Sequence, residues 1–447
     1  MPSADNGAPL THRRVWRLAT PVILANLSIP LMGAVDTAVM GHLPDAAFIG
    51  GVALGGMVFS FLYWMFSFLR LGTTGQVAQA LGRGDTAEIR AALFRAAAIA
   101  LAIGLVLVAL HDPLGRIAFW IVEAPGKTDA LARSYYEIRI WAAPCVLFHY
   151  VAIGWLFGLQ RMATALVLMI AVNVLNAALA ILFVPGLGWG IEGVATATLI
   201  AEACSLPLGA VLIWRTLRGA SLRGGHRPSR AQLMAPARLA TMLRINRDIF
   251  LRTLLLLISF AWFTLQGAAL GETLLAANAV LMNLQTLLAY GLDGFAHAAE
   301  ALVGAAVGRR DRAAFRDAVV KTSQAALVIA IVVAVFYGTA GYWLIGLFTD
   351  IPTVRAGAHE YLPWLIASPI VSVWGFQLDG ICIGATRTAA MRNAMFVVLP
   401  VLLAAGYLLV PVWGNHGLWL AFMLFMAARG LTLLPALRNI DRDLAAR

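Results

Sequence analysis

Residues 91–111, with the sequence AALFRAAAIALAIGLVLVALH, form an apolar run that contains one formally charged residue, Arg95. About 20 such residues are enough to cross the hydrocarbon core of a bilayer as a helix. Further runs of this kind, each bounded by charged residues or by glycine and proline clusters, lie at 15–41, 49–80, 132–157, 163–184, 190–214, 248–271, 275–306, 319–347, 359–384, 393–411 and 415–437. The sequence therefore predicts an all-α polytopic membrane protein with twelve transmembrane helices.

The composition excludes the soluble classes of protein. The chain has 447 residues, of which 61% are hydrophobic and 12% are charged. In soluble globular proteins about 25% of residues are charged, which is about twice the fraction in this chain. Disordered chains contain few apolar residues, whereas this chain is rich in them. The three cysteines all fall within apolar runs, so we interpret them as buried thiols and not as a disulfide framework.

The excess of positive charge is explained by the distribution of arginine. Lysine and arginine outnumber aspartate and glutamate by 33 to 22, which gives a net charge of +11. If the N-terminus is cytoplasmic, most basic residues lie in inside segments, above all in the loop 215–247. The outside segments carry only Arg116, Lys127, Arg133 and Arg355. This positive-inside bias predicts that both termini are cytoplasmic, and it makes a nucleic-acid partner unnecessary.

The two halves of the chain resemble each other at a fixed offset. Gly82-Arg83-Gly84-Asp85 matches Gly308-Arg309-Arg310-Asp311 at an offset of 226, and the same offset pairs Gly158 with Gly384. We interpret the repeated turn as the end of one helix, with aspartate as the cap of the next. The repeat predicts a six-helix lobe over 1–214 and another over 248–447, joined by the basic cytoplasmic loop 215–247. Parallel repeats of this kind are related by a pseudo-two-fold axis along the membrane normal, with a transport site near the midplane.

Ionisable residues inside a span are costly, so each needs a partner or a wet cavity. Asp36 lies in the first span, and Arg70 lies in the second. Asp36 could cap a bent helix, or it could exchange a proton or bind a cation; Arg70 could form a salt bridge with it or tune its ionisation. Pro21 and Pro30 interrupt the backbone hydrogen bonding of the first helix and allow it to bend.

The eighth span carries Asp293, His297 and Glu300, whose spacing places them on one helix face. Two carboxylates and an imidazole on one stripe are typical of a proton or cation relay. The alternative is a structural ion network that Arg252 and Asp379 complete.

Two asparagines of the fifth span, Asn173 and Asn176, lie close to one helix face, where they either pack between helices or line a cavity. The sequence contains no ATP-binding P-loop, no cluster of metal ligands and no nucleophile-elbow motif. We therefore expect no cofactor and no enzymatic activity.

Three segments resemble one known family of membrane proteins. They are Gly33-Ala34-Val35-Asp36-Thr37-Ala38-Val39-Met40-Gly41-His42-Leu43, Asn246-Arg247-Asp248-Ile249-Phe250-Leu251-Arg252 and Leu378-Asp379-Gly380-Ile381-Cys382-Ile383-Gly384-Ala385-Thr386-Arg387. Together they are similar to segments of the MATE (multidrug and toxic compound extrusion) transporters, and most similar to the branch of the DNA-damage-inducible protein F (DinF).

The resemblance implies roles for particular residues. The acid that matches Asp36 is central to coupling in relatives, and the proline that matches Pro21 is a proposed bend. Asn176 and Thr198 match polar members of the same site. Relatives often carry a second acid where this chain has Ala180, so the acids Asp293, Glu300 and Asp379 of the second half are expected to carry more of the coupling.

The function implied by the resemblance is secondary active antiport. A monomer in a bacterial inner membrane would export organic, often cationic or amphipathic, compounds in exchange for H+ or Na+ by alternating access. The alternative is a flippase for lipid-linked precursors, which belongs to the same superfamily. A flippase for anionic pyrophosphate lipids needs several buried bases, and the candidates here are few: Arg70, Arg139, Arg252 and Arg429.

Overall fold

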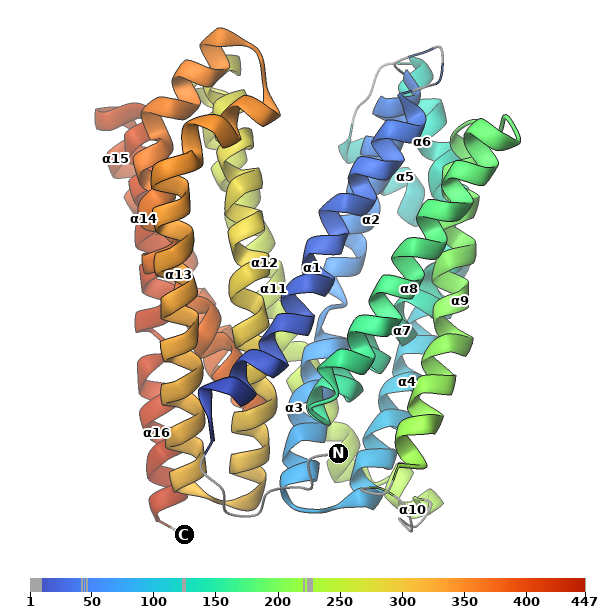
Figure 1. Cartoon of the computed structure of the whole chain (residues 1–447), viewed down its shortest axis with the longest axis vertical. Coiled ribbons are helices and arrows are strands. Elements are labelled where there is room, and N and C mark those ends of the chain that lie inside the picture. The colour runs from blue at the N-terminus through green and yellow to red at the C-terminus, as the bar shows by residue number, and fades with distance from the viewer. Residues whose placement is uncertain are drawn as a thin grey trace. The chain divides into compact units, whose positions relative to one another are not determined.

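The computed structural model describes residues 10–41, 43, 45, 47–122, 126–219, 222 and 228–446 (Figure 1). These residues are almost entirely helical, and no strand occurs among them. The helices are α1 (His12–Met40), α2 (Ala47–Met65), α3 (Phe68–Gly82), α4 (Thr86–Ala109), α5 (His111–Ile121), α6 (Gly126–Arg139), η1 (Ile140–Ala142), α7 (Ala143–Gly158), α8 (Met162–Ile181), η2 (Leu182–Gly186), α9 (Ile191–Leu217), α10 (Arg230–Leu233), α11 (Pro236–Ala269), α12 (Glu272–Arg309), α13 (Arg312–Phe348), α14 (Pro352–Gly384), α15 (Thr388–Leu431) and α16 (Leu434–Ala445).

Each of the twelve predicted spans corresponds to a helix or to consecutive helical segments. Ten stretches of the described residues are long and apolar enough to cross a membrane. One of them contains α15, in which Gly414 has non-helical backbone angles (φ 53°, ψ −131°) and so divides the two last predicted spans. The remaining predicted span corresponds to α1, which has 29 residues and runs without interruption through Pro21 and Pro30. The all-α membrane fold predicted from the sequence is confirmed.

The chain divides into two compact units. The N-terminal unit comprises Leu24–Ala80 and Gly84–Met242, and the C-terminal unit comprises the chain through Ile23, Leu81–Arg83 and Leu243–Arg447. In the N-terminal unit α4 packs against α7, α8 against α9, and α2 against α6. In the C-terminal unit α12 packs against α13 and α14, and α14 also packs against α15.

These units differ in extent from the lobes expected at 1–214 and 248–447. The first turns of α1 belong to the C-terminal unit because they pack on α12: the rings of Trp16 and Phe295 lie 5.0 Å apart, edge to face. Of the expected loop 215–247, residues through Met242 belong to the N-terminal unit, while 220, 221 and 223–227 lie outside the described residues.

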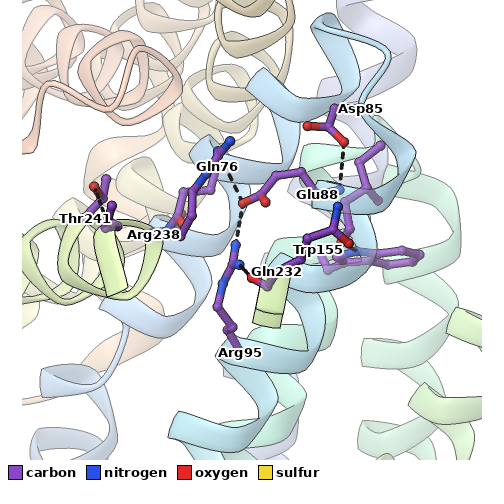
Figure 2. Close-up of polar contacts among 11 residues, drawn as sticks. Gln76, Asp85, Glu88, Arg95, Trp155, Gln232, Arg238 and Thr241 are labelled. Carbon is purple, nitrogen blue, oxygen red and sulfur yellow. Dashed lines mark hydrogen bonds and ion pairs between the residues drawn. The ribbon is translucent and has the colours of Figure 1, made fainter. Parts of the chain in front are cut away.

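The second part of that loop is attached to α4 within the N-terminal unit (Figure 2). Arg95 of α4 donates from Nη1 to the backbone oxygen of Gln232 at 3.0 Å and forms an ion pair with Glu88. Arg238, at the start of α11, approaches the same carboxylate at 3.7 Å. Arg95 is buried, so its charge is compensated by a carboxylate and not by water. The segment from Arg230 to Met242 therefore belongs to the N-terminal unit.

The repeated turn has the same backbone conformation in both halves. Gly84 (φ 69°) and Arg310 (φ 58°), which are 226 residues apart, both have left-handed backbone angles. Asp85 and Asp311 each accept a hydrogen bond of 2.9 Å from the backbone N–H three residues later and so cap α4 and α13. The sequence interpretation of this turn as a helix end followed by a cap is confirmed.

Glycines on α14 allow its backbone to touch that of α12. A Cβ atom added to Gly380 would lie 2.4 Å from the carbonyl oxygen of Ala296, and one added to Gly384 would lie 2.4 Å from that of Glu300. Small residues four apart permit such close approach of membrane helices, where packing replaces the hydrophobic driving force.

The N-terminal unit contains the same contact at the offset of 226. A Cβ atom added to Gly154 of α7 would lie 2.3 Å from the carbonyl oxygen of Arg70, and one added to Gly158 would lie 2.8 Å from that of Thr74. The Thr74 hydroxyl also donates to the Gly154 carbonyl at 3.1 Å. Residues that match at the offset of 226 therefore make the same backbone contact in both units.

Replacing Gly380 with Ala is expected to destabilise the protein by about 1–3 kcal/mol, because a backbone carbonyl cannot move aside as a flexible side chain can. The measurement is thermal unfolding of the detergent-solubilised protein. Gly338→Ala is the matched control, since Gly338 lies within α13 and has nothing within 4 Å of the added Cβ. Equal unfolding temperatures for the two variants would contradict the assigned contact.

Candidate functional site

In the N-terminal unit, Asp36 is a partly buried acid within an apolar helix. It lies in the second half of α1, and its Oδ1 atom is buried without a hydrogen-bond partner among the described residues. The cation that acts electrostatically on this carboxylate is Arg139. A carboxylate oxygen that is buried and not hydrogen-bonded can take up a proton or bind a cation.

Arg139 is paired with a second acid of the same unit. It ends α6, just before the short helix η1, and donates from Nη2 to Oε1 of Glu202 on α9 at 3.0 Å. Its Nη1 donates to the Tyr135 hydroxyl at 3.0 Å. The other carboxylate oxygen of Glu202 is buried and has no partner in the described part of the chain.

Sequence reasoning named Arg139 only as a buried base and did not consider Glu202. The available signal was an acid inside the apolar run 190–214, in the same half as Arg139. The pairing itself could not be read from the sequence, because the two residues are 63 positions apart on different helices.

Aromatic rings surround the guanidinium of Arg139. Its Cζ atom lies 4.8 Å from the ring centroid of Phe59 and 5.7 Å from that of Tyr135. Phe59 in turn stacks on Tyr136 at 5.4 Å. The Tyr63 side chain is buried, and its hydroxyl lacks a hydrogen-bond partner among the residues described. Aromatic faces and carboxylates together are the groups that recognise organic cations.

The predicted asparagines of α8 are joined to neighbouring helices. Asn176 donates to the Thr198 hydroxyl of α9 at 3.2 Å, and Asn173 donates to the Ser28 hydroxyl of α1 at 2.7 Å. Ala180, where the family resemblance implies an acid in relatives, is fully buried. Arg70 acts electrostatically on Tyr150 of α7.

In the C-terminal unit, Asp379 is held by two arginines. Its Oδ2 atom accepts from Arg429 of α15 at 2.9 Å and forms a second ion pair with Arg252 of α11. All three side chains are nearly buried, with exposed fractions of 12% for Asp379 and Arg252 and 5% for Arg429. Breaking a buried charge pair of this kind is costly.

The predicted stripe on α12 lies in one continuous helix. His297 Nδ1 and Glu300 Oε1 are 2.9 Å apart, and both side chains are buried. Glu300 Oε2 is buried without a partner among the described residues. Asp293 acts electrostatically on Arg429, which connects the stripe with Asp379. The residues that the sequence singled out in this half therefore form two groups: His297 with Glu300, and Asp379 with Arg252, which Asp293 joins through Arg429.

The two units hold their acids differently. Asp379 receives two guanidinium groups, whereas Asp36 and Glu202 share one. Among the described residues, no group of three or more histidine, cysteine, aspartate or glutamate side chains is arranged to hold a metal ion. The charged groups brought together in the N-terminal unit are two carboxylates and one guanidinium.

Comparison with known proteins gives full-length relatives. The model of the MatE family matches this chain twice, at residues 21–182 and 249–408. The DNA damage-inducible protein F of Escherichia coli is 39% identical over 97% of this chain and 93% of its own length, and a probable multidrug resistance protein NorM of Rhizobium meliloti is 26% identical over 96% and 94%. A crystal structure of MATE in the bent conformation superimposes with a TM-score of 0.87 at 20% identity, covering 97% of this chain and 96% of that one, which shows the shared fold. The chain belongs to the MatE family.

Proposed function

We propose that this protein is a proton-coupled antiporter that exports organic, often cationic or amphipathic, compounds across a bacterial inner membrane. The relatives that are named multidrug resistance proteins support transport of such compounds. The observation that carries the coupling is Asp36, whose Oδ1 atom is buried and lacks a hydrogen-bond partner among the described residues.

The proposed cycle depends on competition at the N-terminal unit. A proton from outside neutralises Asp36, weakens binding of the organic cation and releases it outward. Deprotonation toward the cytoplasm then restores the affinity. Antiport requires only that the two ligands disfavour each other by about 1–3 kcal/mol, and this coupling is reciprocal.

The rest of the cycle follows from the repeat. We propose that the two lobes, with boundaries near 214 and 248, alternate access as a monomer whose termini are both cytoplasmic, and that α1 bends at Pro21. Asp293, Glu300 and Asp379, together with His297 and Arg252, form the coupling group of the C-terminal unit in this proposal. Asn173, Asn176, Thr198 and Arg70 support the site around Asp36.

A flippase for anionic lipid precursors is disfavoured by the charges of the N-terminal unit. Two acids, Asp36 and Glu202, face one base, Arg139, within electrostatic range. An anionic pyrophosphate headgroup would need the opposite balance.

The test is efflux of a fluorescent organic cation from proteoliposomes that contain the purified protein. A pH gradient alone is expected to drive efflux, and a sodium gradient alone is not. Efflux driven by a sodium gradient alone would show that the coupling ion is Na+ and not the proton. Absence of efflux under either gradient would contradict antiport of organic cations.

A further inference from the structure

We propose that Glu202 is the second carboxylate of the N-terminal site, and that Arg139 leaves this site with one excess negative charge, which one proton or one monovalent organic cation neutralises. This inference rests on the proposed antiport and specifies its residues, its ligand charge and its stoichiometry. Asp36, Arg139, Glu202, Tyr63 and Tyr135 are called the N-terminal charge site below.

The first step is the position of Glu202 relative to Asp36. Both carboxylates act on the same guanidinium: Glu202 binds it at 3.0 Å, and Asp36 interacts with it electrostatically. Tyr135, which accepts from Arg139 at 3.0 Å, experiences the charges of both acids. The three helices α1, α6 and α9 therefore bring their charged groups into one electrostatic unit.

The second step is the charge count. Two carboxylates and one guanidinium leave one negative charge in excess. The groups that Glu202 also influences are neutral side chains, namely Tyr63 on α2, Tyr135 on α6, and Cys145 and Tyr150 on α7. Arg70 acts on Tyr150, and the cation that acts on each of the two acids is Arg139.

The third step is the capacity to bind a ligand. Four polar atoms of the N-terminal charge site are buried and lack hydrogen-bond partners in the described chain. They are Asp36 Oδ1, Glu202 Oε2, Arg139 Nε and the Tyr63 hydroxyl. Tyr63 itself is only 5% exposed. Leaving such atoms unsatisfied is costly, so they indicate a place where a ligand or water supplies the missing partners.

The aromatic surroundings specify the kind of cation. Phe59 and Tyr135 already place their ring faces against the guanidinium of Arg139, at 4.8 Å and 5.7 Å. Both rings are buried, and Phe59 also stacks on Tyr136, so a planar or aryl-substituted organic cation binds to these aromatic faces by taking the place of the guanidinium. The site therefore favours a monovalent aromatic cation and exchanges it for one proton.

The experiment measures binding of tetraphenylphosphonium to the purified full-length protein by calorimetry at one fixed pH. Glu202→Gln removes the excess charge and is expected to weaken binding at least about tenfold, since one unit charge within about 5 Å at an effective dielectric of about 20 corresponds to more than that factor. Arg139→Gln is expected to bind at least as tightly as the wild type. The double variant, which restores one excess negative charge, is expected to return to within about threefold of the wild type.

The double variant separates a charge role from a structural one. If the ion pair only held α6 against α9, Glu202→Gln and Arg139→Gln would weaken binding equally, and the double variant would not recover. Equal weakening in the two single variants would overturn the inference. So would a double variant that does not recover, or unchanged binding in Glu202→Gln. If Glu202→Gln does not fold, the double variant decides, because it removes both members of the Arg139–Glu202 ion pair and leaves neither of them buried without its partner.

The matched control is Glu192→Gln. Glu192 lies on the same helix as Glu202 but is exposed, and it accepts from the Ser134 hydroxyl at 2.9 Å. Its replacement is expected to leave binding unchanged. If the wild-type protein transports organic cations but Glu202→Gln binds tetraphenylphosphonium normally, only this inference is refuted. If the wild-type protein does not transport organic cations, the proposed antiport is refuted.

Discussion

Replacing Asp36 with Asn is expected to abolish substrate-driven proton release from proteoliposomes. The amide has almost the same shape as the carboxyl group, but it cannot gain or lose a proton as a carboxyl group does. The Oδ1 atom of Asp36 has no hydrogen-bond partner in the described structure, so the substitution breaks no side-chain hydrogen bond at that atom. The measurement is the change of a pH-sensitive dye when an organic cation is added.

The control for this experiment is Asp112→Asn on α5. The Asp112 side chain is 75% exposed, and its Oδ1 atom lies 3.6 Å from Nε2 of His111. Proton release is expected to stay at the wild-type level. If Asp36→Asn releases protons as the wild type does, coupling does not depend on Asp36 and must be assigned to the acids of the C-terminal unit.

Replacing Asp379 with Asn is expected to cost about 3–5 kcal/mol of stability, because it leaves two guanidinium groups buried beside each other without their shared carboxylate. Arg252 and Arg429 both bind Oδ2 of Asp379, and neither has more than 12% of its side chain exposed. The expected result is a large fall in the unfolding temperature of the detergent-solubilised protein.

An exposed ion pair of the same unit provides the comparison. Asp443 pairs with Arg387, and about half of each side chain is exposed. Water and salt screen such a pair, so Asp443→Asn is expected to change stability little. If Asp379→Asn unfolds at the wild-type temperature but no longer couples transport to protons, Asp379 serves in coupling and not in holding the helices together.

The sequence predicted the parts of this fold that depend on local pattern. Apolar runs identified the spans because a membrane helix needs about 20 apolar residues in succession. The turn at Gly84 and its counterpart at Arg310 were recognised because a helix end and an aspartate cap lie within a few residues of each other. The fixed offset also anticipated Gly158 and Gly384 as equivalent positions, although it could not say which helix they contact.

The partners of the buried charges were harder to predict. The sequence suggested that Arg252 and Asp379 belong to one network, and the structure shows their ion pair. It did not assign Arg429 to Asp379, and it overlooked Glu202 as the partner of Arg139. These pairs join helices that are distant in the chain, so their formation depends on how the bundle packs and not on local spacing.

The glycine contacts have a consequence for evolution. Gly380 and Gly154 hold their helix pairs together through main-chain atoms, which every residue type shares. Side chains on other faces of the same helices are therefore free to change without loosening the scaffold. Selection for resistance to a new compound can act on residues of those faces while the architecture is inherited intact, so one duplicated framework can diversify into exporters with different substrate ranges.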